Sequence, residues 1–169
     1  LAGAKLGGAR LDRVDLRGAD LRDVDLTSTS FDRVDARDAK LDRTRLDMFR
    51  ASGSDFSGAS FTGAEGLLGT FGRSRCVKSD FTGASFKLLT FDRCELAEAR
   101  FGAKLEHVRF DDCTASGLVL EGAQLDGTSF NACKLPGASA ATVAGEGAVF
   151  YRSVLDGADF QRARLAASH

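Results

Sequence analysis

Several residue types are scarce or absent in this chain of 169 residues. It has no tryptophan, one tyrosine, one methionine and one proline. No apolar run approaches the roughly 18 residues of a membrane span, and no signal peptide is recognisable, so we expect no membrane contact. Net charge is also nearly absent, since 23 Lys and Arg oppose 24 Asp and Glu. A domain held on nucleic acid is usually strongly basic, and direct nucleic-acid binding is therefore not expected.

What the chain has in excess is phenylalanine, and its positions are regular. Large apolar residues recur at every fifth position from Leu1 to Phe101 and, after a shift of one residue, from Leu105 to Leu165. Of these 34 centres, 27 are Leu or Phe, and 12 of the 13 phenylalanines are among them; the exception is Phe49. An internal repeat of this kind indicates the architecture before any local pattern does.

A second pattern accompanies the centres. Two positions before each centre stands a small residue, which in 30 of 33 cases is Ala, Val, Cys, Ser, Thr or Gly. Residues separated by two point to the same side of an extended segment. A period of five fits neither a helix nor a simple strand. It fits a chain that turns a corner every five residues and buries one large and one small side chain per side, so that four sides close a coil of about 20 residues.

Every fourth centre then falls into one column along the coil axis. One such column is almost entirely aromatic, with only Ala51 interrupting it, and it survives the one-residue shift because the step from Phe91 to Phe110 is 19 residues. Stacked rings in a narrow, close-packed interior predict a structural Phe ladder. Its members are Phe31, Phe71, Phe91, Phe110, Phe130 and Phe150.

The repeat unit resembles that of a known family. The segments ADLRD at 19–23, ASFTG at 59–63 and ADFQR at 158–162 are similar to the A(D/N)LXX unit of pentapeptide-repeat proteins. The resemblance covers essentially the whole chain. It implies an all-β fold, a right-handed quadrilateral parallel β-helix of about 8 coils stacked at about 4.8 Å. We expect a single domain over 1–169, with a register slip at 102–104. A weak stretch at 136–149 either bulges or forms a thinly packed coil in register.

The sequence offers little for catalysis or metal binding. The four cysteines, Cys76, Cys94, Cys113 and Cys133, are spaced by about one coil rather than as metal ligands, and we expect buried free thiols, as in a reducing cytoplasm. His107 and His169 lack a second histidine or a carboxylate at ligand spacing. No phosphate-binding loop and no Ser/His/Asp set can be assembled. We therefore expect a protein that is not an enzyme and has no cofactor.

The outward positions form candidate stripes. One is acidic and consists of Asp15, Asp35, Asp55 and Glu95, with Arg75 interrupting the row. Another is apolar and is a candidate partner surface, because exposed apolar ridges often mark interfaces. Beside it, Phe49 and Leu89 enlarge normally small inward sites. The alternative is that this corner repacks locally and its leucines fold inward. The apolar stripe consists of Met48, Leu67, Leu68, Leu88 and His107.

Two functions are compatible with these features. The resemblance to the quinolone-resistance and MfpA-type rods implies a DNA-mimic protein that occupies the DNA site of DNA gyrase or topoisomerase IV, because regularly spaced carboxylates can meet a basic groove. The alternative is a general interaction or scaffold solenoid with an unknown partner, a piece of a longer chain. A homodimer through a rod end is a further expectation, since solenoid ends that lack caps invite pairing.

Overall fold

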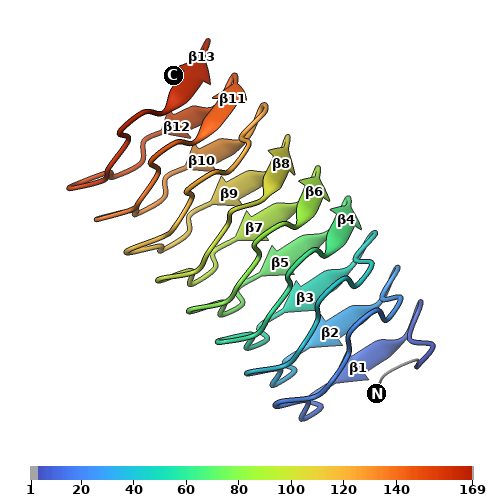
Figure 1. The fold of residues 1–169 in the computed structure, drawn as a ribbon. Helices are drawn as coiled ribbons and strands as arrows, with labels where there is room; N and C mark the ends of the chain where they lie inside the picture. The colour runs from blue at the N-terminus through green and yellow to red at the C-terminus, as the bar shows by residue number, and fades with distance from the viewer. Residues whose placement is uncertain (1–3, 169) are drawn as a thin grey trace.

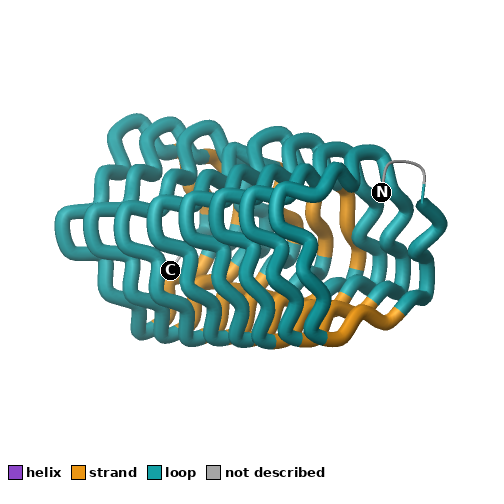
Figure 2. Tube along the Cα trace, turned by 90° about the horizontal axis from the view of Figure 1, so that it is seen from below, coloured by secondary structure: helices purple, strands orange, loops and turns teal. Residues whose placement is uncertain are grey.

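The computed structural model describes residues 4–168, which form an elongated stack of similar coils (Figure 1). The strands are short and lie side by side from one coil to the next, and the remaining chain consists of turns and bends (Figure 2). Within residues 4–168 there is no helix. The molecule is a parallel β-solenoid, as the five-residue period predicts.

Each strand has three residues, with a buried or half-buried middle residue that is a centre of the repeat. The strands are β1 (Arg10–Asp12), β2 (Ser30–Asp32), β3 (Arg50–Ser52), β4 (Glu65–Leu67), β5 (Thr70–Gly72), β6 (Ser85–Lys87), β7 (Thr90–Asp92), β8 (Lys104–Glu106), β9 (Arg109–Asp111), β10 (Ser129–Asn131), β11 (Ala144–Glu146), β12 (Val149–Tyr151) and β13 (Arg164–Ala166).

Pairing between coils defines four faces. Face A is an eight-stranded parallel sheet in the order β1-β2-β3-β5-β7-β9-β10-β12. Face B follows it along the chain and contains the bridge from Asp15 to Asp35, and face C contains the bridge from Asp20 to Lys40. Face D carries β4-β6-β8 and β11-β13. Partners are 20 residues apart on most of the rod, so each side chain lies beside its counterpart in the next coil.

The corners depend on backbone in the left-handed region. The carbonyl of Leu16 accepts a hydrogen bond from the Ala19 amide at 2.9 Å, and Gly18 between them has φ +62°. This is the pattern of a type II turn, which requires a positive φ at its third residue. Many corners place a non-glycine residue at this position, including Asp23 (φ 61°) and Lys78 (φ 57°). The turns expose these side chains and return the chain to the core.

The two irregular segments keep the coil register. The one-residue slip lies at residues 102–104, where the Ala103 amide bonds to the Phe101 carbonyl at 2.7 Å, and beyond it Phe91 pairs with Phe110. In the stretch at 136–149, Ser139 bridges Val119 and Asp159, and Gly145 pairs with Leu165. The stretch therefore forms a coil in register, with Ala140 fully buried.

Hydroxyl and thiol groups at the small inward positions bond between coils. The Ser79 hydroxyl donates to the Phe56 carbonyl at 2.9 Å, 23 residues earlier. The thiols of Cys94 and Cys133 make the equivalent contacts to the carbonyls of Phe71 and Phe110, at 3.1 and 3.2 Å. Buried polar groups need such partners, and here the partner is the backbone of the preceding coil.

Candidate interaction surfaces

The Phe ladder is a stack of nearly parallel rings. Ring centroids of Phe91 and Phe110 are 4.9 Å apart with planes at 6°, and those of Phe110 and Phe130 are 4.6 Å apart with planes at 2°. Phe71 and Phe150 extend the stack on either side at 4.9 and 5.0 Å. The ladder survives the register slip because Phe110 pairs with Phe91 in the sheet.

Phe31 joins the ladder through Phe49. The interrupting residue Ala51 leaves space next to Phe31, and the ring of Phe49 lies 5.1 Å from that of Phe31 and 5.5 Å from that of Phe71. Phe49 is fully buried although it occupies a normally small position. A large side chain and a small one have therefore exchanged places within one coil, which preserves the core volume.

A second aromatic column lies on face C and was not singled out in the sequence. Phe81 stacks on Phe61 at 4.7 Å and on Phe101 at 4.4 Å, with planes within 17°. Its rings meet those of the first column edge to face, as Phe81 does with Phe91 at 5.9 Å and 82°. The same 20-residue spacing reveals this column once the centres are sorted by face.

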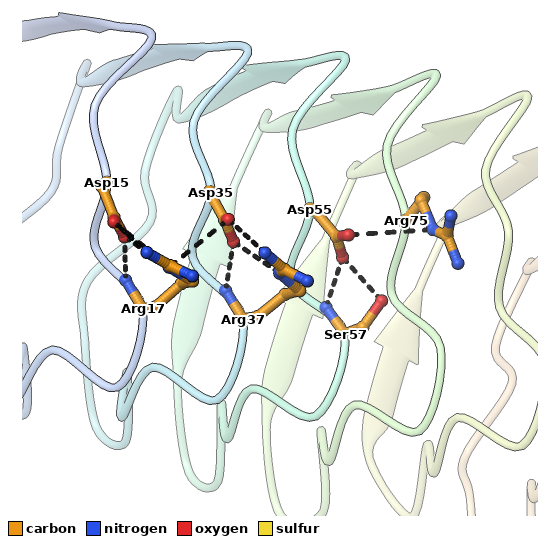
Figure 3. Close-up of polar contacts among 7 residues, drawn as sticks. All are labelled: Asp15, Arg17, Asp35, Arg37, Asp55, Ser57 and Arg75. Carbon is orange, nitrogen blue, oxygen red and sulfur yellow. Dashed lines mark hydrogen bonds and ion pairs between the residues drawn. The ribbon is translucent and has the colours of Figure 1, made fainter.

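The acidic stripe lies on face B as its spacing predicts, but arginines two residues further along accompany it (Figure 3). The Nε of Arg17 donates to both carboxylate oxygens of Asp15, at 3.0 and 3.1 Å, and its Nη2 donates to Oδ2 at 2.6 Å. The same Nε lies 3.6 Å from Asp35 of the next coil. Arg37 forms the equivalent pair with Asp35 at 2.6 Å. The row is thus an alternating ladder of carboxylates and guanidinium groups.

Further along face B the ladder changes composition. Asp55 accepts hydrogen bonds from the amide and hydroxyl of Ser57, at 2.9 and 2.6 Å (Figure 3). Arg75, which interrupts the acidic row, lies 3.8 Å from Asp55 and 3.5 Å from Glu95. All four predicted carboxylates are therefore paired with a neighbouring cation, directly or across the coil step.

These contacts lower carboxyl pKa values. The side-chain hydrogen bond from Arg17, followed by the bond from its backbone amide, lowers the pKa of Asp15 from 3.8 to about 2. The equivalent bond from Arg37 lowers the pKa of Asp35. Both carboxyls remain ionised at neutral pH, but exposed ion pairs of this kind contribute little to stability.

The apolar stripe is exposed. Met48, Leu68 and Leu88 follow one another at the corner between faces D and A, with exposed fractions of 48%, 56% and 43%. Leu67 is also exposed, and His107 continues the row as another exposed residue. Inward packing of these leucines does not occur. We call the four residues Met48, Leu67, Leu68 and Leu88 the apolar corner.

The backbone explains why these side chains point outward. Met48, Leu68 and Leu88 have φ values of 54°, 60° and 58°, which is the left-handed corner conformation. The inward position beside them is filled by Phe49 and Leu89, both fully buried. Leu89 occupies the space beside Gly66 and Gly69, where its side-chain atoms come within 3.4 Å and 3.3 Å of a Cβ placed at each glycine. The core is already full below the apolar corner.

The cysteines lie in the interior of the rod. Cys76, Cys94, Cys113 and Cys133 are free and buried. Within residues 4–168 no group of three or more His, Cys, Asp or Glu side chains is arranged for a metal ion, and no helix is long and apolar enough to cross a membrane. His169 lies outside the described residues.

Comparison with known sequences places the repeat in a family. The model of pentapeptide repeats (8 copies) matches residues 1–33, 9–47 and 103–139. The chain is a pentapeptide-repeat protein. No curated protein sequence matches the chain.

Solved structures share the fold of this pentapeptide-repeat protein. A trypsin-treated variant of QnrB1, a plasmid-mediated fluoroquinolone resistance protein, superposes with a TM-score of 0.83 at 19% identity, over 99% of this chain and 87% of that chain. HetL, a pentapeptide-repeat protein involved in heterocyst differentiation regulation from Nostoc sp. strain PCC 7120, gives a TM-score of 0.50 at 20% identity over 97% and 88%. A pentapeptide-repeat protein of the Arabidopsis thaliana thylakoid lumen gives 0.50 at 21% identity over 57% and 64%. The shared property is the rod.

Proposed function

We propose that this pentapeptide-repeat protein is a non-enzymatic, cytoplasmic binding protein whose partner is a type II topoisomerase, DNA gyrase or topoisomerase IV. The proposal is supported by the solenoid shared with QnrB1, a protein of fluoroquinolone resistance, over nearly the whole chain. The observation that carries it is the aligned row of Asp15, Asp35 and Asp55 on face B. A rod with carboxylates at coil spacing can enter a basic groove that is shaped for phosphates.

The arginines of the ladder set the strength of this binding. Arg17 and Arg37 retain side-chain exposures of 58% and 46% although they are paired. Because exposed ion pairs are weak, lysines and arginines of a basic groove can compete for the carboxylates. The compensating arginines then lower affinity, since they repel the cations of the groove. Removing them should make the rod a better mimic of DNA.

The test is a gyrase assay with matched variants. The wild-type rod should inhibit DNA supercoiling or reduce quinolone-stabilised cleavage at micromolar concentration. The variant Arg17→Gln/Arg37→Gln should act at several-fold lower concentration, and Asp15→Asn/Asp35→Asn/Asp55→Asn should lose the effect. Arg22→Gln, which breaks the ion pair of Arg22 with Asp20 on face C, is the control. If the wild-type rod has no effect on either DNA gyrase or topoisomerase IV, the proposal is refuted.

A second candidate is an interaction scaffold, and the apolar corner favours it. Large apolar side chains at exposed corners are unnecessary for a rod that acts by charge alone. Under this function the partner recognises the apolar corner rather than the carboxylates of face B. Leu68→Gly would then abolish partner binding, while Asp35→Asn would leave it unchanged.

A further inference from the structure

The side chains of the apolar corner remain about half exposed in the isolated rod. Elsewhere in the same row, glycine holds the left-handed position at Gly127 and Gly147, with φ values of 59° and 67°. A leucine in this conformation is strained, because its Cβ approaches the backbone carbonyl. Leu68 and Leu88 accept that strain and still expose about half of their side chains. Charged side chains hold the same conformation at other corners, as Arg33 and Arg93 do, so the distinctive feature of this corner is its apolar character, which a contact with another molecule would cover.

The residues beside the corner carry opposite charges on the two sides of Leu67, an arrangement that is complementary to a second, antiparallel copy of itself. Asp47, Leu67 and Lys87 occupy equivalent positions of three successive coils, next to the row of Met48, Leu68 and Leu88. One carboxylate and one ammonium group thus stand one coil on either side of the Leu67 and Leu68 pair. This arrangement suits an isologous interface, because a two-fold axis brings each residue that lies off the axis against a different residue of the other copy.

We propose that two copies of this chain pair side by side and antiparallel through the apolar corner, with the two-fold axis at Leu68. Leu68 then meets Leu68 of the second copy, and Met48 meets Leu88. Asp47 lies opposite Lys87 twice, which adds a charge-assisted contact at each end of the strip. Lys87 already bonds Glu106 of its own chain at 2.5 Å, so it becomes a bridge between two carboxylates.

Charges further from the corner permit the same arrangement. One coil beyond Lys87, His107 falls opposite Ser28, and Arg109 falls opposite Ser30, so no like charges oppose one another there. Glu65 of one chain faces Glu65 of the second chain, but this residue lies on face D, away from the corner where the two chains touch. Face B, with the Asp15 to Glu95 ladder, is not part of the contact. The pairing is therefore independent of the proposed topoisomerase function.

The interface is a narrow strip between two convex corners. Stable protein interfaces bury about 1,600 Å² in total, and four apolar side chains per copy supply less. We expect a weak dimer, with a dissociation constant on the order of tens of micromolar. Neither end of the rod takes part, which distinguishes this dimer from one formed through exposed coil ends.

The first experiment is sedimentation equilibrium from about 5 to about 500 µM, a range that brackets the expected constant. The wild-type chain should pass from monomer to dimer. Leu68→Gly should weaken association at least tenfold while its melting temperature stays equal or rises, because glycine relieves the left-handed strain. Thr142→Gly, at another corner with φ 62°, controls for the backbone change, and Val154→Ser, at 43% exposure on face B, controls for the loss of apolar surface.

The second experiment tests the antiparallel register. Asp47→Lys and Lys87→Asp should each weaken the dimer several-fold, and the double variant should restore it, because the two charges exchange places across the axis. Leu68→Cys should form an intermolecular disulfide under mild oxidation, since a residue on the axis meets itself and the native cysteines are buried. Val154→Cys should not. A monomer at every concentration would overturn the proposal, as would dimers that persist in Leu68→Gly or a charge exchange that fails to restore binding.

Discussion

The rings of Phe110 and Phe130 are stacked, with centroids 4.6 Å apart and planes inclined by 2°. Here the parallel coils fix the distance, because Phe110 and Phe130 are direct partners in face A. The coil spacing therefore sets the distance between successive rings of the ladder.

Phe91→Ala tests the ladder energetically. Phe91 stacks on Phe71 and Phe110 and is fully buried, so its truncation removes ring contacts on both sides and leaves a cavity. The free energy of unfolding should fall by about 3–5 kcal/mol, as for other buried aromatic deletions. Urea denaturation followed by circular dichroism measures it. A near-neutral result would contradict a close-packed ladder.

Gly145→Ala tests the thin coil near the end of the rod. Gly145 has φ +148°, and a Cβ there would come within 2.8 Å of the backbone carbon of Leu125. Backbone cannot move aside as a side chain can, so we expect a loss of about 3 kcal/mol. Gly83→Ala is the comparison, since its φ is +70° and its Cβ would lie at an ordinary contact distance, 3.9 Å, from the backbone nitrogen of Gly63. That variant should cost about 1 kcal/mol, and equal melting temperatures for the two would refute the clash.

Arg17→Gln tests the electrostatics of face B. The Arg17 guanidinium holds the pKa of Asp15 at about 2, so the variant should return this pKa toward 3.8. Because the folded-state pKa is lowered, the pair stabilises the fold fully above pH 3.8, and this stabilisation is lost as the pH falls toward 2. NMR titration of the Asp15 carboxyl measures the shift. An unchanged pKa in the variant would show that the pair does not persist in solution.

Thiol reactivity tests the interior of the rod. Burial raises the pKa of the Cys76 thiol above its ordinary value of 9.0, and the reactive form of cysteine is the thiolate. The native protein should not react with a disulfide reagent at pH 8 within minutes. In denaturant all four free cysteines should react. Rapid labelling of the native protein would mean that the coils open locally.

Much of the fold could be predicted from the sequence because the repeat is local. Every five residues repeat the same pattern of one small and one large inward residue. The 19-residue step from Phe91 to Phe110 indicated that the aromatic column continues across the shorter coil. The exchange of Phe49 with Ala51 was visible as an oversized residue near a small one. That the Phe49 ring fills the gap in the ladder could be recognised only from its contacts with the rings of Phe31 and Phe71, which lie one coil to either side.

The candidate surfaces were predicted less completely. The row of Asp15 and Asp35 followed from spacing alone, but the compensating row of Arg17 and Arg37 has the same spacing and was overlooked. Whether Leu68 points inward or outward could not be read from its type. The outcome depends on the left-handed backbone at residue 68 and on Leu89 filling the space beneath, which are properties of the folded coil.

The shortened coil at residues 102–104 shows that the register of the rod is set from one coil to the next and not over its whole length. Each face takes its alignment from the coil before it, as Phe110 does from Phe91 and Val119 from Arg100. When one residue is missing at a corner, the pairing register is therefore restored within the next coil. The same loss in the middle of a face would exchange inward and outward side chains. Such a rod can therefore tolerate a single deletion at a corner, whereas the number of residues within a face has to stay the same.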